Sequence, residues 1–176
     1  LITVTASNVN IDPFTFDGMG VANYGVIASG FAADGLVVDG NTFKGFNEAG
    51  IYVSNASGGT SLITGNTFEA SSTRGVHVGG LSGTGTILNI VDNTMGSDGK
   101  LVQGVRVSNN VSCEAALNVT GTNTIDSTGD GIDFEGSVTG LASVNINGAT
   151  VTSNGDAVAF RGAVTDADIK VDNSSL

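Results

Sequence analysis

The sequence predicts an all-β solenoid, in which short strands stack coil upon coil. The first observation is a repeat: GNTFKGFNEAGIYV at 40–53 is nearly rewritten as GNTFEASSTRGVHV at 65–78. The second is composition, because 27 glycines but only one proline among 176 residues indicate many turns and few rigid breaks. Together they favour short strands over long helices. The length and the 40% of hydrophobic residues suit one domain, spanning 1–176.

Apolar residues recur at intervals of 25 to 29 residues along the whole chain. A repeat of this size cannot bury its apolar face alone, whereas stacked repeats bury it between them. We therefore expect coils that begin near residues 9, 36, 61, 88, 117, 144 and 169. The residues that close the first short strand of each coil are Ile11, Val38, Ile63, Ile90, Val119, Ile146 and Val171.

Each coil continues with a threonine followed by an apolar residue, and then with a strand that usually opens on glycine, such as GIYV at 50–53. The alternation in this second strand indicates that one face is buried. A further apolar anchor follows at Phe31, Ala56, Leu81, Val111, Val138 and Val164. The residues after threonine should form one column inside the solenoid, and they are Phe16, Phe43, Phe68, Met95, Ile125 and Val151.

The repeat unit, apolar-x-apolar-x-x-Asn-Thr-Phe followed by Gly-Ile-x-Val, resembles the parallel β-helix repeat of the pectate-lyase-like superfamily. The resemblance covers about Val9 to Val171 and implies a single-stranded right-handed parallel β-helix of about six to seven coils. Right-handed crossovers between parallel strands are also the general rule. The superfamily includes polysaccharide lyases and hydrolases, phage tailspikes and noncatalytic bacterial surface proteins, so the fold alone does not fix a function.

Two polar columns accompany the apolar ones. Asparagines at one turn predict a structural ladder of stacked amides, because buried amides need hydrogen-bond partners. A column of threonines, from Thr15 to Thr150, raises the alternative of an ice- or glycan-binding face. The neighbouring outward column is mixed, however, and threonine suits exposed strand positions in general. The ladder asparagines are Asn41, Asn66, Asn93 and Asn123.

The outward positions of the glycine-led strands carry the most varied chemistry. We call the following residues the strip: Tyr24, Tyr52, Arg74, His77, Arg106 and Asp133. Such groups on one face could bind sugars. In an enzyme, His77 would serve as general base, Arg106 would neutralise an anionic substrate and Asp133 would act as acid.

Cross-strand charge pairing explains the same strip residues without catalysis. The chain also lacks the paired aspartates, the Gly-His-Gly and the Arg-x-Lys segments of the related enzymes. We therefore expect no catalytic residues, with the strip as a binding surface and the three residues above as the alternative.

The net charge of −11 argues against nucleic acid and anionic membranes as partners. No apolar run approaches the length of a membrane span, so we expect no membrane insertion. Cys113 is the only cysteine, and no metal-binding motif is visible. We expect no cofactor. Acidic turns such as TGDGIDFE at 128–135 leave calcium as an alternative, although turn chemistry explains their Asp-Gly pairs.

The leading hypothesis is a noncatalytic structural module at the cell surface or outside the cell, either a rigid stalk or a filament-forming, adhesive segment. No capping helix is visible at either end, so we expect flanking β-helix coils or end-to-end stacking with another copy, and a chain that is a segment or subunit of a longer structure. The main alternative is a polysaccharide lyase or glycoside hydrolase acting on an acidic polysaccharide. An ice- or glycan-binding protein is the weaker alternative.

Overall fold

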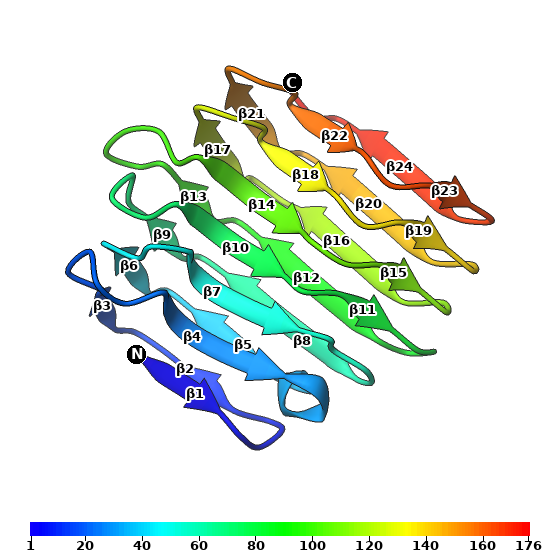
Figure 1. The fold of residues 1–176 in the computed structure, drawn as a ribbon, viewed down its shortest axis with the longest axis horizontal. Helices are drawn as coiled ribbons and strands as arrows, with labels where there is room; N and C mark the ends of the chain where they lie inside the picture. The colour runs from blue at the N-terminus through cyan, green and yellow to red at the C-terminus, as the bar shows by residue number, and fades with distance from the viewer.

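The computed structural model describes the backbone of residues 1–176 and all side chains except those at 31 and 32. Short strands wind into coils that stack along one axis, and every strand pair is parallel (Figure 1). Each coil passes in turn through three long parallel sheets, which we number 1, 2 and 3. Most later coils add a short strand that belongs to a fourth sheet, sheet 4. The expected all-β solenoid of stacked coils is confirmed.

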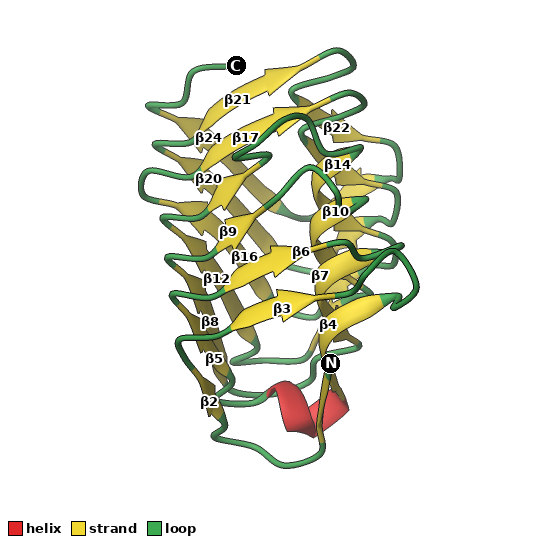
Figure 2. Ribbon diagram, turned by 90° about the vertical axis from the view of Figure 1, so that its left-hand side faces the viewer, coloured by secondary structure: helices red, strands yellow, loops and turns green.

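Three long sheets surround the core, as the side view shows (Figure 2). Sheet 1 contains β2 (Asn10–Ile11), β5 (Val37–Asp39), β8 (Thr60–Thr64), β12 (Ile87–Val91), β16 (Ala116–Thr120), β20 (Ser143–Asn147) and β24 (Asp168–Asp172). Sheet 2 contains β3 (Thr15–Asp17), β6 (Thr42–Lys44), β9 (Thr67–Phe68), β13 (Thr94–Met95), β17 (Thr124–Ser127) and β21 (Thr150–Ser153).

Sheet 3 forms the face turned to the viewer in Figure 1 and carries the strip. It contains β1 (Ile2–Val4), β4 (Tyr24–Ser29), β7 (Ala49–Ser54), β10 (Arg74–Val78), β14 (Gln103–Val107), β18 (Ile132–Phe134) and β22 (Val158–Phe160). Sheet 4 contains β11 (Leu81–Ser82), β15 (Val111–Ser112), β19 (Val138–Thr139) and β23 (Val164–Thr165). A single 3₁₀ turn, η1 (Gly30–Ala33), follows β4, and no helix in the described structure is long and apolar enough to cross a membrane.

The apolar columns expected from the repeat lie in register from coil to coil. Phe16 pairs with Phe43, and Phe43 with Phe68, so that their rings stack with centroids 4.9 and 5.1 Å apart. Met95 continues this column, and all of its members are buried. Among the later anchors, Val164 is 46% exposed, because β23 pairs with a strand on one side only. The anchor expected at 31 lies outside the described side chains.

Five strands of sheet 3 have a glycine at or next to their first residue, where packed side chains of sheet 2 leave no room for a Cβ; these are Gly25, Gly50, Gly75, Gly104 and Gly131. A Cβ placed on Gly50 would lie 2.7 Å from the ring of Phe68 in the next coil and 2.9 Å from the Cβ of Phe43. The backbone at Gly50 is not in the left-handed region, so this constraint comes from packing alone. Glycine therefore makes room for the large side chains of sheet 2.

We predict that Gly50→Ala destabilises the protein by about 1–3 kcal/mol, because an extra methyl group must displace packed rings. The free energy of unfolding in urea measures the effect. Ala157→Gly, the reverse change at the corresponding position of the last coil, is the control and should cost only about 0.5–1 kcal/mol. Equal effects of the two changes would contradict this account of the glycine column.

The ladder asparagines are joined by hydrogen bonds at the turn between sheets 1 and 2. Asn66 Oδ1 accepts from the backbone N–H of Asn41 at 3.0 Å and from Asn41 Nδ2 at 3.1 Å. Asn66 Nδ2 donates to the carbonyls of Val38 and Thr64 and to Asn93 Oδ1. Asn93 bonds to Asn123 in the same way. The ladder satisfies buried backbone groups that the turn leaves without partners.

We predict that Asn66→Ala destabilises the protein by about 2–4 kcal/mol, since several buried donors and acceptors lose their partners together. Asn118 lies half-buried on the outer face of β16, where its Nδ2 donates to Asn89 Oδ1 at 2.9 Å. Asn118→Ala is the matched control and should cost less than about 1 kcal/mol. Thermal and urea unfolding of both variants distinguish the ladder from ordinary surface amides; comparable losses would contradict its special role.

The loops from sheet 2 to sheet 3 vary in length while the strands on both sides keep their register. Residues 45–48 make this connection in one coil, and residues 96–102 make it two coils later. The columns on either side of both loops remain paired. Length changes at this corner therefore leave the strand pairing intact, as expected for connecting loops.

Candidate binding surface

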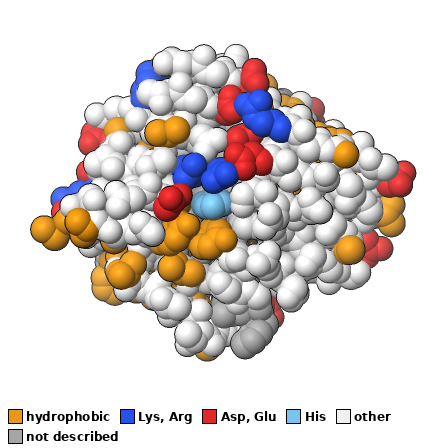
Figure 3. Space-filling model, in the orientation of Figure 1, with side chains coloured by type: hydrophobic (Ala, Val, Ile, Leu, Met, Phe, Trp, Pro, Cys, Tyr) orange, Lys and Arg blue, Asp and Glu red, His pale blue; other side chains and the backbone are white. Residues whose placement is uncertain are grey.

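The outer face of sheet 3 gathers most of the chemically versatile side chains. Both tyrosines, the only histidine and all three arginines of the chain project from it or from the turn that follows β22. In Figure 3 the basic, acidic and histidine side chains meet in the middle of this face. The chain has 13% charged residues, so this concentration marks sheet 3 as the candidate functional surface.

Register places the strip on consecutive rungs. His77 on β10 pairs with Tyr52 on β7 and with Arg106 on β14, and Arg106 pairs with Asp133 on β18. Because side chains alternate between the two faces of a strand, all four leave sheet 3 on the outer side. Rungs of parallel strands are spaced about 4.8 Å apart, so neighbouring side chains are in contact range.

Aromatic rings form the lower part of the strip. The rings of Tyr24 and Tyr52 stack with centroids 4.9 Å apart, and the imidazole of His77 lies 4.6 Å beyond Tyr52. The phenol oxygen of Tyr52 reaches over Gly79, where a Cβ would come within 2.9 Å of it. These three rings form a row along the axis of the solenoid, in which the two tyrosines stack and the imidazole is tilted by 40° from Tyr52.

His77 is 7% exposed, because the neighbouring side chains cover it. Its Nε2 lies 2.9 Å from Ser108 Oγ, and its Nδ1 has no partner among the described residues. Burial, together with the positive charges of Arg106 and Arg74, lowers the pKa of His77 to about 4. The imidazole is therefore neutral at pH 7.

A chain of charge pairs forms the upper part of the strip. Arg74 donates to Glu48 at 2.9 Å and to Gln103 at 2.7 Å, and Gln103 donates in turn to Asp133 at 2.7 Å. Arg161 donates to Asp133 as well, at 3.1 Å.

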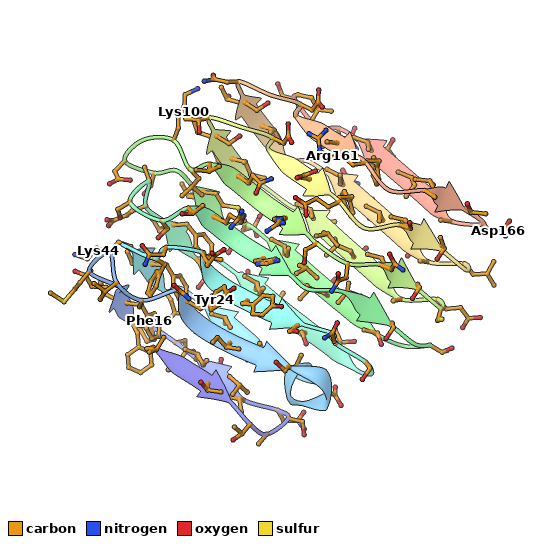
Figure 4. The ribbon with its side chains drawn as sticks, viewed as in Figure 1. Phe16, Tyr24, Lys44, Lys100, Arg161 and Asp166 are labelled. Carbon is orange, nitrogen blue, oxygen red and sulfur yellow. The ribbon has the colours of Figure 1, made fainter. Side chains whose placement is uncertain are left out.

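Further ion pairs belong to the same array. Arg161 also pairs with Asp130, and Arg106 pairs with Glu135 at 2.6 Å. Figure 4 shows Tyr24 and Arg161 at the two ends of this array. Each arginine is thus engaged by a carboxylate on another coil.

Asp133 is 2% exposed and accepts hydrogen bonds on both carboxylate oxygens. Burial raises its pKa, while Arg161 opposes this effect. The pKa of Asp130 is lowered: its own burial acts in the opposite direction but is outweighed by the hydrogen bond from Arg161 and the backbone N–H of Asp156. The two carboxylates therefore differ in environment, although both contact the same guanidinium.

The structure brings the six strip residues onto one face but does not leave them equally accessible. The exposed histidine and aspartate expected from the sequence are instead buried, because the long side chains of adjacent rungs lie over them. Partners that the sequence analysis missed are Glu48, Ser108, Glu135 and Arg161. The last three lie two residues beyond Arg106, Asp133 and Ala159, so the alternation of the strands, extended past each strand end, would have found them.

Other surfaces carry less organised chemistry. The threonine column on sheet 2 is in register, but the position two residues further along each strand is charged or mixed, as in Asp17 beside Lys44. No group of three or more His, Cys, Asp or Glu side chains suited to a metal ion occurs among the described residues. The outer face of sheet 3 therefore remains the surface on which the polar side chains form the most extensive network of hydrogen bonds and ion pairs.

Stacked parallel coils, three principal sheets, a turn ladder and an elaborated outer face define a parallel β-helix protein. The whole chain, residues 1–176, matches the family model described as the right-handed β-helix region, and the protein belongs to that family. No curated protein and no solved structure matches the chain. The pectate-lyase-like resemblance of the repeat is thereby confirmed at the level of the fold.

The depressed pKa of His77 predicts a pH-dependent stability. The unfolded chain binds a proton near pH 6.5 and the folded chain only near pH 4, so stability falls as the pH is lowered through this window. We expect the wild type to lose about 1–3 kcal/mol relative to His77→Gln between pH 6.5 and 4. Urea unfolding of both proteins across this range measures the difference, in which the carboxylate titrations common to both cancel. Parallel pH profiles would contradict the prediction.

Proposed function

We propose that this chain is a noncatalytic structural module, a rigid β-helical rod that acts as a stalk or an adhesive spacer. The observation that supports the proposal is that the histidine, arginine and aspartate residues of the strip are hydrogen-bonded to residues on adjacent coils. Asp133 is held by Gln103 and Arg161, and His77 is covered and bonded to Ser108. A general acid or base must reach a substrate proton, whereas these groups bind neighbouring coils.

The charge pairs brace the solenoid along its axis. Arg74, Arg106 and Arg161 each join residues that are 26 to 31 positions apart in sequence, or about one coil. The ladder and the aromatic column make similar links at other corners. Because each coil contacts mainly its neighbours, such links set the stiffness of the rod.

We propose a location outside the cell or at the cell surface, where a rod with a net charge of −11 stays dispersed. As partners we propose further β-helix coils or another copy of the chain. The backbone edges of β22 and β24 are available for strand pairing, since each is paired on one side only within the described structure. We propose no cofactor.

A second candidate function is binding and cleavage of an acidic polysaccharide. It is favoured by the row of rings formed by Tyr24, Tyr52 and His77, which lies beside Arg74 and Arg106 and combines aromatic and basic groups on one face. In that case His77 would act as base, Arg106 would bind the acidic group and Asp133 would be the acid. This role requires the side chains of the strip to separate when substrate binds.

Incubation with a panel of acidic polysaccharides decides between these functions. We expect the wild type to release neither reducing nor unsaturated sugars, because its titratable strip residues are paired or covered. The Thr94→Ala variant, altered on sheet 2, serves as a control for contaminating activity. Release of sugar by the wild type and by Thr94→Ala, but not by His77→Ala, would overturn the noncatalytic proposal.

A further inference from the structure

A notch interrupts the corner between sheets 3 and 4, beyond the end of the strip. The coil containing β10 turns this corner with Gly79 and Gly80, whereas the coils on either side turn it with Ser54–Asn55 and Ser108–Asn109. Two missing side chains between two polar pairs leave a depression at this corner. Figure 1 shows the strands around it, the ends of β7, β10 and β14 and the short strands β11 and β15. We call it the corner notch.

The corner notch has a volume of about 300 Å³ and opens to solvent. Its walls are the amides of Asn55, Asn109 and Asn110 and the hydroxyls of Ser82 and Ser112. Asn55 donates to Ser54 Oγ, and Asn110 Oδ1 accepts from the backbone N–H of Ser137. These bonds orient two amides while leaving Asn55 Oδ1 and Asn110 Nδ2 without a partner among the described residues.

The lining selects against charged and apolar ligands. It contains no carboxylate for a cation and no basic group for an anion, and the nearby guanidinium of Arg106 is held by Glu135. The side chain of Leu81 is buried, so it offers little apolar surface. What remains is a set of neutral groups that both donate and accept hydrogen bonds.

A peptide strand is also a poor fit for this corner. β10 is already paired with β7 and β14, and β11 with β15. The backbone N–H of Leu81 donates to Asn110, and the carbonyl of Gly80 accepts from Ala56. No strand edge faces the notch, so an added strand would find no free ladder of backbone groups there.

We propose that the corner notch binds a neutral pyranose, a single uncharged sugar ring. Vicinal hydroxyls act as donors and acceptors at once and match adjacent amides of the kind provided by Asn55, Asn109 and Asn110. The volume lies at the lower end of small-molecule sites, which suits one ring rather than a chain of sugars. The site is separate from the strip and does not depend on the structural role proposed above.

Titration of the ¹⁵N-labelled chain with the methyl glycosides of glucose, galactose and mannose, and with N-acetylglucosamine, tests the proposal. We expect at least one of them to shift the side-chain amide signals of the notch asparagines, with a roughly millimolar Kd because few contacts are made. Galacturonic acid, which is anionic, should bind more weakly. Absence of shifts with every neutral sugar, or tighter binding of galacturonic acid, would overturn the proposal.

Two variants remove notch amides with little disturbance of the fold. Asn55 has a φ of 50°, so Asn55→Gly keeps the backbone while deleting the amide. Asn109 is exposed, and Asn109→Ala is the second variant. Each should weaken binding about tenfold, the usual effect of losing one hydrogen bond to a ligand.

Asn173→Gly is the matched control, because Asn173 also has a positive φ, 48°, but lies far from the notch. Its affinity should equal that of the wild type. Ser82→Tyr fills the notch from an exposed position and should abolish binding. Unchanged affinity in Asn55→Gly, Asn109→Ala and Ser82→Tyr would contradict the assignment even if a sugar binds elsewhere.

Discussion

The structure depends on one constraint, which is that inward side chains of successive coils lie directly over one another. Parallel strand pairing fixes the spacing between coils, and any residue in an apolar column must fit the residues above and below it. The rings of Phe16, Phe43 and Phe68 satisfy this requirement by stacking. The glycines that face them satisfy it by having no side chain at all. Large side chains on sheet 2 thus occupy the space left by the glycines on sheet 3.

The same stacking governs the outer face. Groups that are about one coil apart in sequence become neighbours, so an arginine on one rung meets a carboxylate on another without any special turn. Such pairing uses the chemistry of the strip to connect coils. It also explains how His77 and Asp133 come to be covered on a surface that the alternation of the strand assigns to solvent. The neutral corner notch differs from the strip because two consecutive glycines remove side chains from one rung.

Much of the fold could be predicted because the repeat places the inward residues at intervals of about one coil along the sequence. The residues after threonine, the strand-closing aliphatic residues and the turn asparagines all occupy the columns that their spacing indicated. The reason for the glycine column could not be read from the sequence, since the ring of Phe68 that excludes a side chain at Gly50 comes from the following coil.

The candidate site was predictable only in part. Register follows from the repeat, and so do the neighbours of His77 on β7 and β14. Burial depends on which way long side chains turn once they leave the sheet. Arg161 illustrates this point: it lies beyond the end of β22, yet its guanidinium returns to Asp130 and Asp133 in the preceding coil. The alternation of the strand assigns Arg161 to the outer face, but the direction in which its guanidinium turns does not follow from the spacing.

At the corner between sheets 2 and 3, the length of the connecting loop can change without altering the register of the stacked strands. The connection at 96–102 is longer than the one at 45–48, and the rungs beneath both continue without a shift. A foreign peptide inserted between Ser97 and Lys100, which are exposed, would therefore be displayed outside the rod while the buried Leu101 keeps its place in the core. Grafts on successive coils would be attached about 4.8 Å apart, so the solenoid would present peptides at fixed intervals along its axis.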